Sequence, residues 1–263
     1  MTTVGILGAG MVGSTWLYGV PWNALEMTPL VFEPAGIDVV PFDRVAEASE
    51  LGVCDIVLVF VSGGIAEAAI RSTFSPDETT GPDEFLDFSS NGPEGKKRIA
   101  DWCIARGSTY VDVTILGAVA ANGLSTPVAV AGAPSKAAER LLAASGASQL
   151  RVENSEAGAA ARLKLVRSIV TKGLEVLAYE AQTIAEEYRL GDDYRRVFDD
   201  FEAGSFTTII DSMVKTHLDH RERRGKEVRE LIAMVNAGGR TSALLDAVAQ
   251  NYEHGAFRPI QPK

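Results

Sequence analysis

The chain has 263 residues, of which 46% are hydrophobic and 23% are charged, so it can form one large domain or two smaller ones. Its formal net charge of −10 argues against a nucleic-acid-binding surface, which needs concentrated positive charge. No stretch predicts a membrane span or a signal peptide, and the two cysteines, Cys54 and Cys103, lack metal-ligand spacing. We therefore expect a cytoplasmic protein that takes a small-molecule substrate and no nucleic acid, membrane or metal.

A glycine-rich turn follows the first predicted strand, residues 4–7. In the pattern Gly-x-Gly-x-x-Gly, the first glycine allows a tight turn and the second lets a pyrophosphate approach the backbone. The third lets the following helix lie close to the strand, and the free N–H groups of that helix face the phosphates. A turn merely shaped by glycine is the alternative. The predicted cofactor-binding residues are Gly8, Gly10, Met11, Val12 and Gly13.

An acidic residue, Glu33, lies twenty positions after Gly13, at the end of the apolar run 30–32. A carboxylate at this point binds the ribose hydroxyls of NAD and repels the 2′-phosphate of NADP. The next residues, 34–36, contain no arginine that would hold a phosphate. The sequence therefore favours NAD as the cofactor, with NADP as the alternative.

The first 155 residues alternate between strand-like and helix-like runs, which predicts a Rossmann-type, doubly wound α/β sheet. The run 56–61 is apolar on both faces, as is typical of a central parallel strand. It ends at Val61 and Ser62, and ligands bind at this end of the strands in such sheets, so we assign both residues to the cofactor site. The predicted strands are 4–7, 29–33, 55–61, 85–88, 109–113, 127–130 and 150–152, and the clearest predicted helices are 64–71, 94–105 and 136–144.

The second part, 156–263, predicts an all-α domain, because strand signals vanish and proline is absent until Pro259. We expect one long helix over about 156–189, then three or four helices and an irregular tail after Gly255. Breaks are expected near 191–192, 203–204 and 237–239. The long helix would extend roughly 50 Å, so a second copy of the chain is expected to cover its remaining apolar side.

Polar residues form one stripe along this long helix. At 100° per residue, Lys164, Ser168, Thr171, Lys172 and Glu175 share one face, and apolar residues occupy the other side. A solvated face is the ordinary interpretation of such a stripe. However, the helix follows the last predicted strand directly, so its first turns should border a cofactor bound to the sheet. This placement makes Lys164 a candidate for proton transfer.

Four segments of the chain resemble the β-hydroxyacid dehydrogenases, a family that includes 6-phosphogluconate and 3-hydroxyisobutyrate dehydrogenases. They are the glycine-rich turn, 87–93 (DFSSNGP), 112–118 (DVTILGA) and 164–168 (KLVRS). The segments 172–175 and 220–224 are similar to a branch with a phosphogluconate-dehydrogenase-like helical domain of unassigned function. The chain departs from the better-known members at Leu116, Ala118 and Ser168, where they have serine, glycine and asparagine. These departures favour a substrate other than a heavily hydroxylated sugar acid.

The resemblance implies that Lys164 is the general acid/base of a hydride transfer between a nicotinamide and a small hydroxyacid or its keto or aldehyde form. A lysine half-buried beside apolar residues has a lowered pKa, which suits this role. The resemblance and the predicted positions give the substrate-binding candidates Ser89, Ser90, Leu116, Gly117, Ala118 and Ser168. For the triplet Ser89, Ser90 and Asn91, an Asx or Ser helix cap before Pro93 is an equally good interpretation, and the two roles are compatible.

Histidines and arginines recur at helical spacing over 217–224. Arginines surround His217 and His220, which argues against a metal site. A solvated basic face is the ordinary interpretation, and the alternative is an anion clamp in which Arg221 or Arg224 binds a substrate carboxylate or phosphate.

Two other functions fit the same sequence. One is an imine reductase on the same fold. The other is a dinucleotide-binding sensor or assembly protein without catalysis.

Overall fold

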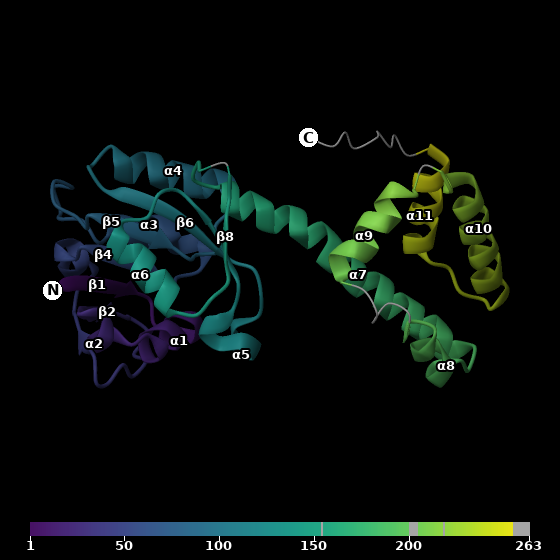
Figure 1. Ribbon diagram of the computed structural model, residues 1–263, viewed down its shortest axis with the longest axis horizontal. Coiled ribbons are helices and arrows are strands. Elements are labelled where there is room, and N and C mark those ends of the chain that lie inside the picture. Colours follow the sequence, from purple (N-terminus) through teal and green to yellow (C-terminus); the bar gives the residue numbers. More distant parts are fainter. Residues whose placement is uncertain (154, 200–204, 218, 255–263) are drawn as a thin grey trace. The chain divides into compact units, whose positions relative to one another are not determined.

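A computed structural model describes residues 1–153, 155–199, 205–217 and 219–254 (Figure 1). The chain divides into two compact units, Met1–Ile169 and Val170–Lys263. The sequence places a domain boundary at 155/156, just before the long helix α7 (Ala159–Glu187), whereas the contacts divide the chain within this helix. The start of α7 belongs to the first unit because Ala159 and Ala160 pack against two alanines of that unit's sheet, Ala129 and Ala131.

The N-terminal unit contains an eight-stranded sheet in the order β3-β2-β1-β4-β5-β6-β7-β8. Neighbouring strands are parallel except β6 and β7. The predicted α/β fold is therefore confirmed, and the short strand β3 is an addition to it. The strands are β1 Thr2–Leu7, β2 Met27–Phe32, β3 Asp43–Arg44, β4 Ile56–Val59, β5 Glu84–Asp87, β6 Thr109–Ile115, β7 Val128–Ala131 and β8 Gln149–Arg151.

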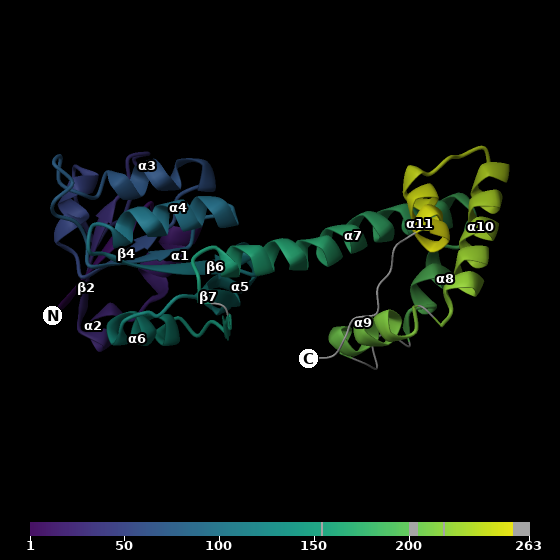
Figure 2. The same cartoon turned by 90° about the horizontal axis from the view of Figure 1, so that it is seen from above.

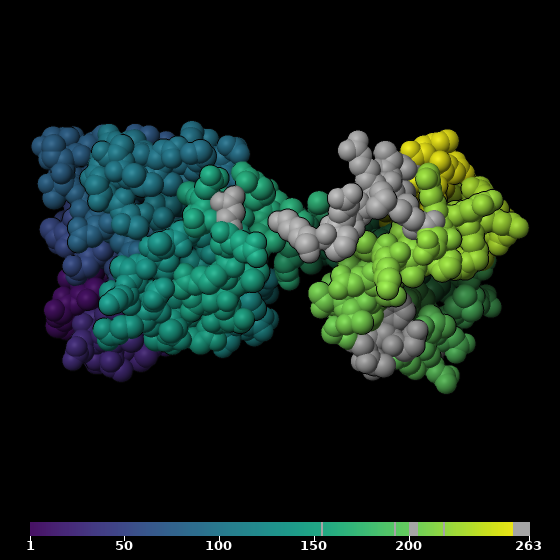
Figure 3. Space-filling view, turned by 45° about the horizontal axis from the view of Figure 1, so that its top comes forward, coloured from purple at the N-terminus to yellow at the C-terminus, as the bar shows by residue number. Residues whose placement is uncertain are grey.

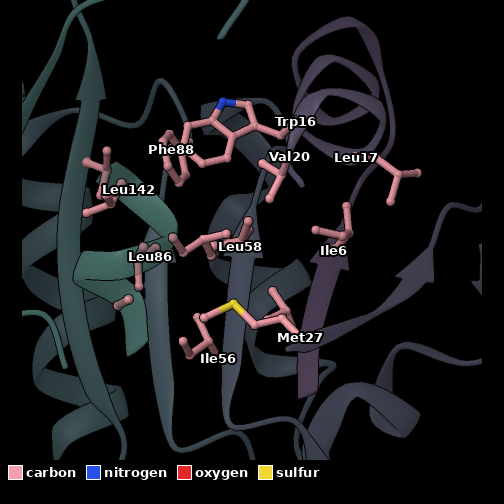
Figure 4. Packing of buried hydrophobic residues seen from close by; sticks show 14 of the residues in the cluster. Ile6, Trp16, Leu17, Val20, Met27, Ile56, Leu58, Leu86, Phe88 and Leu142 are labelled. Atoms are coloured by element: carbon pink, nitrogen blue, oxygen red, sulfur yellow. The ribbon is translucent and has the colours of Figure 1, made fainter. Parts of the chain in front are cut away.

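Helices cover both faces of this sheet, with α3 and α4 on one face and α6 on the other (Figure 2). Each face has its own apolar cluster, and residues such as Ile6, Trp16 and Leu58 fill the cluster beneath α1 and α6 (Figure 4). Figure 3 shows the surface of this unit in space-filling form. The α-helices of this unit are α1 Met11–Gly19, α2 Trp22–Leu25, α3 Ala66–Arg71, α4 Pro93–Ile104, α5 Val119–Asn122 and α6 Lys136–Ala144, with the first turns of α7.

Both cysteines are buried in the N-terminal unit. Burial raises the pKa of the Cys54 thiol to about 11 and that of Cys103 to about 12, because a thiolate would lose its hydration. Nearby carboxylates, Asp55 and Asp87 respectively, act in the same direction. Both side chains are therefore protonated at neutral pH and behave as small apolar groups.

The described part of the C-terminal unit is helical, as the sequence predicts. It holds the rest of α7, then α8 Gly191–Arg196, α9 Phe206–Lys215, α10 Arg221–Ala237 and α11 Ala243–His254. Its buried apolar cluster is small and consists of Ile184, Val235 and Leu245, with Leu231 and Ile232 against it. The predicted break at 237–239 is found at the end of α10, whereas the predicted break at 203–204 and the tail after Gly255 lie outside the described residues. No described helix is long and apolar enough to cross a membrane.

Candidate functional site

A pocket of about 430 Å³ opens beside the carboxyl ends of the central strands in the N-terminal unit. In the sheet, β2 lies on one side of β1 and β4 on the other. The loops after β1 and β4 therefore run in opposite directions at this point and leave room for a ligand. The lining is mostly apolar. Its residues are Met11, Val12, Phe60, Val61, Ser62, Phe88, Ser90, Ile115, Gly117, Ala118, Val119, Ala120 and Lys164.

The glycine-rich turn lies beside this pocket and has the backbone that a dinucleotide needs. Gly8 adopts a φ of +94°, which favours glycine, and a Cβ on Gly13 would lie 2.0 Å from the Gly8 carbonyl oxygen. A Cβ on Gly10 would meet nothing within 4 Å, so the backbone is open there. Gly10 is also the N-cap of α1 and forms no side-chain cap, which leaves the first N–H groups of the helix available to an anion. These features fit a dinucleotide.

Glu33 directly follows β2, and its buried carboxylate is already hydrogen-bonded to the backbone. Oε2 accepts the N–H of Ala9 at 2.6 Å, and Oε1 accepts the N–H of Ala35 at 2.7 Å. A carboxylate has about four acceptor positions, so ribose hydroxyls can still donate to it. The exposed Arg44, from β3, donates to the main-chain oxygen of Glu33 and has no ion-pair partner within the described ranges. The sequence does not indicate this cation, because Arg44 lies eleven residues after Glu33 and only the fold brings the two together.

Lys164 lies on the second turn of α7, and its half-buried side chain lines the pocket together with Met11, Val12 and Ser90. Burial lowers the pKa of Lys164, since the ammonium loses hydration, and the positive charges of Lys96 and Arg167 lower it further. Among the described residues that line the pocket, Lys164 is the one with a charged side chain. The pocket thus brings a titratable amine next to the predicted cofactor-binding loops.

The loop after β5 places its two serines differently. Ser90 is exposed and lines the pocket, and its Oγ accepts the N–H of Gly63 at 3.4 Å. Ser89 is buried, and its Oγ accepts the N–H of Asn91 at 3.4 Å within the loop. Neither serine caps α4, because Gly92 is the N-cap and Pro93 the first helical residue. The cap interpretation of these serines is therefore wrong.

The other predicted substrate-binding residues of this unit also separate into two groups. Gly117 and Ala118 line the pocket. Leu116 packs instead against the alanine cluster at the start of α7. Its side chain points away from the pocket because successive side chains of an extended segment alternate in direction. Ser168 donates its hydroxyl to the carbonyl oxygen of Lys164 at 2.8 Å, one turn back on its own helix. Substrate binding by these residues stays a prediction.

Arg224 belongs to the C-terminal unit, on α10. Its guanidinium donates to the hydroxyl of Thr216 at 2.9 Å, and the side chain is partly buried. His217 stacks on Tyr252 with ring centroids 5.3 Å apart, and the backbone oxygen of Tyr252 accepts from Arg221 at 2.6 Å. Arg221 thus joins α10 to α11, and the contacts of His217 and Arg224 hold the segment before α10, so the basic segment has a structural role. Among the described residues, no group of three or more His, Cys, Asp or Glu side chains could hold a metal ion.

Several apolar pocket residues were not predicted. The rings of Phe60 and Phe88 pack at a tilt with centroids 4.8 Å apart, and Trp16 packs against both. Ile115 ends β6 at the pocket. In the sequence, Phe60 and Phe88 belong to apolar strand-like runs, which predict core positions, and Ile115 lies just beyond the predicted strand 109–113. Their place just beyond the strand ends was the signal that could have identified them.

No family model matches the sequence, and no curated protein matches it. Solved structures do. An imine reductase variant from Myxococcus stipitatus in complex with NAD+ is similar over 96% of this chain and 93% of its own, with a TM-score of 0.79 and 15% identity. The Myxococcus stipitatus imine reductase in complex with NADP+ has a TM-score of 0.75, with 16% identity and the same coverage. The chain has the fold of these reductases.

A third solved structure is a conserved protein of unknown function whose description reports structural similarity to 3-hydroxyacid dehydrogenases. It is 21% identical, covers 95% of each chain and has a TM-score of 0.62. The neighbours therefore agree with the resemblance to β-hydroxyacid dehydrogenases in fold. Identities this low carry the fold and leave the reaction to the residues of the site.

Proposed function

We propose that this protein is an NAD(P)-dependent oxidoreductase in which Lys164 is the general acid/base. The observation that carries the proposal is the common pocket of Lys164 and the loops after β1 and β4. A bound nicotinamide cofactor would supply or accept the hydride. Gly10 and the first turn of α1 would hold its pyrophosphate, and Glu33 would accept hydrogen bonds from its ribose.

Lys164 would move the proton that accompanies the hydride. In reduction, its ammonium donates a proton to the oxygen or nitrogen of the substrate while hydride reaches the adjacent carbon. In oxidation, the neutral amine accepts the proton from the hydroxyl or amino group. The lowered pKa supports both directions, because both protonation states then lie closer to neutral pH.

Two substrate classes follow. The sequence resemblance implies a small hydroxyacid or its keto or aldehyde form. An imine is the second candidate, because the described lining of the pocket is apolar and offers no arginine to a substrate carboxylate. The imine reductases among the structural neighbours support this candidate as well.

For the cofactor, Glu33 favours NAD, as the sequence predicts, but Arg44 adds a cation at the ribose end. A 2′-phosphate would meet this guanidinium and gain a charge-assisted hydrogen bond. We therefore propose that both NADH and NADPH bind.

The deciding experiment measures absorbance at 340 nm with NADH and NADPH against a panel of β-hydroxyacids, their keto forms and cyclic imines. We expect turnover of one substrate class, and Lys164→Met should lower kcat about 100-fold or more with cofactor binding intact. Lys172→Met is the matched control, since Lys172 is an exposed lysine on the same helix that pairs with Glu175 at 2.8 Å. Equal turnover by Lys164→Met and the control would disprove the role of Lys164.

We also propose a homodimer formed through α7. Exposed apolar side chains run along this helix, and the exposed fractions of Ile169 and Tyr179 are both 74%. A soluble protein rarely exposes a long apolar face without a partner. A second copy of the chain brings the same face and thus gives a symmetric, apolar interface. Sedimentation at micromolar concentration should show a dimer, and a monomer would contradict this proposal.

A further inference from the structure

A fully buried lysine, Lys96 on α4, lies in the same region of the N-terminal unit as Lys164. Its Nζ is 2.8 Å from Oδ1 of Asp112 and donates to the carbonyl oxygen of Asp87 at 2.7 Å. The side chains of Lys96, Asp87 and Asp112 are all 0% exposed. Lysine is almost never fully buried without a partner, so these contacts form a built site in the protein interior.

The other oxygen of the Asp112 carboxylate reaches the start of α7. Its Oδ2 accepts the N–H groups of Gly158 and Ala161, each at 3.1 Å. These N–H groups are among those that a helix leaves without an internal partner, and the helix dipole favours a negative charge there. Asp112 therefore caps α7 from strand β6, and Lys164 follows Ala161 by three residues.

The backbone just before α7 is also closely packed. Gly158 has a φ of +91°, and a Cβ on it would lie 2.4 Å from the carbonyl oxygen of Pro93. Pro93 is the first residue of α4, the helix that carries Lys96. The first turn of α7 is thus held against both β6 and α4, so the position of Lys164 over the pocket depends on these contacts.

Other ionisable groups lie in the region of Lys96 and Lys164. Lys96 lowers the pKa of Lys164 through its positive charge, as does Arg167. Asp87 on β5 accepts the N–H of Ser89 at 2.8 Å and the hydroxyl of Tyr110, and burial beside this carboxylate raises the pKa of Tyr110 well above its usual value. Tyr110 therefore stays protonated. At the surface, Arg162 on α7 pairs with Glu94 on α4 at 3.7 Å.

We propose, given the function proposed above, that Asp112 and Lys96 are positioning residues for Lys164. Asp112 fixes the first turn of its helix to strand β6, and Lys96 keeps a second, immobile positive charge near its amine. The network thereby sets where the proton-transfer group stands.

The test removes the two charges separately. Lys96→Met and Asp112→Asn have similar shapes to the native side chains but lack their charges. The protonation of Lys164 is read directly by competitive acetylation with acetic anhydride across a pH series, followed by mass spectrometry of the peptide that contains it. This readout needs no substrate and no bound cofactor.

The expected shifts have opposite signs. Loss of the positive charge in Lys96→Met should raise the labelling midpoint of Lys164, and loss of the negative charge in Asp112→Asn should lower it. Asp112→Asn should also lower kcat about tenfold or more with the KM for NAD(P)H unchanged, because the helix turn carrying Lys164 is less well held. If Lys96→Met does not fold, the double variant K96M/D112N, which removes the pair together, should have a midpoint near that of the native protein.

The matched control is Glu84→Gln. Glu84 is a buried carboxylate at the opposite end of β5, and it accepts the N–H of Ser135 at 2.8 Å and its hydroxyl at 2.6 Å at the start of α6. Glu84→Gln should lower the free energy of unfolding by a similar amount and leave the labelling midpoint of Lys164 unchanged. Shifts of equal sign in the two site variants, or midpoints equal to that of Glu84→Gln, would overturn the inference. Absence of turnover in the native protein would instead count against the proposed oxidoreductase.

Discussion

The two units of this chain differ in how far each buries its own apolar residues. In the N-terminal unit, two clusters fill both faces of the sheet, and large side chains such as Phe85, Leu58 and Ile6 are fully buried in them. In the C-terminal unit, the described cluster is small, and a groove of about 490 Å³ lies between α7 and the residues of α8, α10 and α11. The first unit can therefore hold a precise site by itself, whereas the second leaves apolar surface exposed, which is the surface that the proposed dimer would cover.

Glycine substitutions test the first half of this comparison and should give the largest effect. Gly13→Ala places a Cβ 2.0 Å from the Gly8 carbonyl oxygen and should lower the free energy of unfolding by about 3 kcal/mol. Denaturant unfolding measures this loss. Gly10→Ala is the matched control for stability, because its Cβ meets nothing within 4 Å, yet it should weaken NAD(P)H binding at least tenfold. Equal stability of the two variants would contradict the close packing of α1 on the turn.

A charge introduced on α7 tests the second part of this comparison, the apolar surface of the C-terminal unit. Leu177→Glu places a carboxylate at the groove of the C-terminal unit and should weaken self-association about 30-fold or more, since a buried interface excludes an unpaired charge. Analytical ultracentrifugation over a concentration series measures the change. Gln182→Glu adds the same charge at an exposed polar position of α7 and should leave the dimer intact. Identical behaviour of both variants would mean that this groove is not part of the interface.

The pH dependence of turnover tests whether Lys164 in the pocket transfers the proton. Because the pKa of Lys164 is lowered, its amine loses the proton at lower pH than a free lysine does. The rate of reduction, which uses the ammonium, should be steady at low pH and fall about tenfold per pH unit above that pKa, while the rate of oxidation should rise toward it. Lys164→Arg, which does not titrate in this range, should lack this limb. A limb that persists in this variant would belong to another group.

The smallest effect is expected at Arg44. Arg44→Ala should weaken NADPH binding about fivefold to tenfold and leave NADH binding nearly unchanged, because the guanidinium, which donates to the main-chain oxygen of Glu33, would meet the extra phosphate that NADH lacks. Fluorescence titration with both cofactors measures the ratio. Arg98→Ala, at an exposed arginine of α4, is the control for general loss of charge. A similar loss for both cofactors would remove Arg44 from the phosphate site.

The sequence predicted the parts of the fold that depend on local pattern. Strand-like apolar runs and the glycine-rich turn located most of the sheet, but β3 was missed because its two residues are exposed and form no apolar pattern. In the site, Lys164 was placed by its position after the last strand. Lys96 could not be placed, because a lysine within a charged helix segment predicts a solvated side chain, and only the fold brings Asp112 to it. The residue pattern also did not indicate that Leu116 packs at the start of α7 or that the hydroxyl of Ser168 bonds within this helix, and substrate binding by both residues stays a prediction.

The two protonated, buried thiols of Cys54 and Cys103 have a practical consequence. Neither should react with maleimides or methanethiosulfonates in the native state, since those reagents need an accessible thiolate. The unmodified protein is thus already a suitable background for attaching fluorophores or spin labels through single introduced cysteines. One label on the surface of each unit would then report distances between them in solution as cofactor is added.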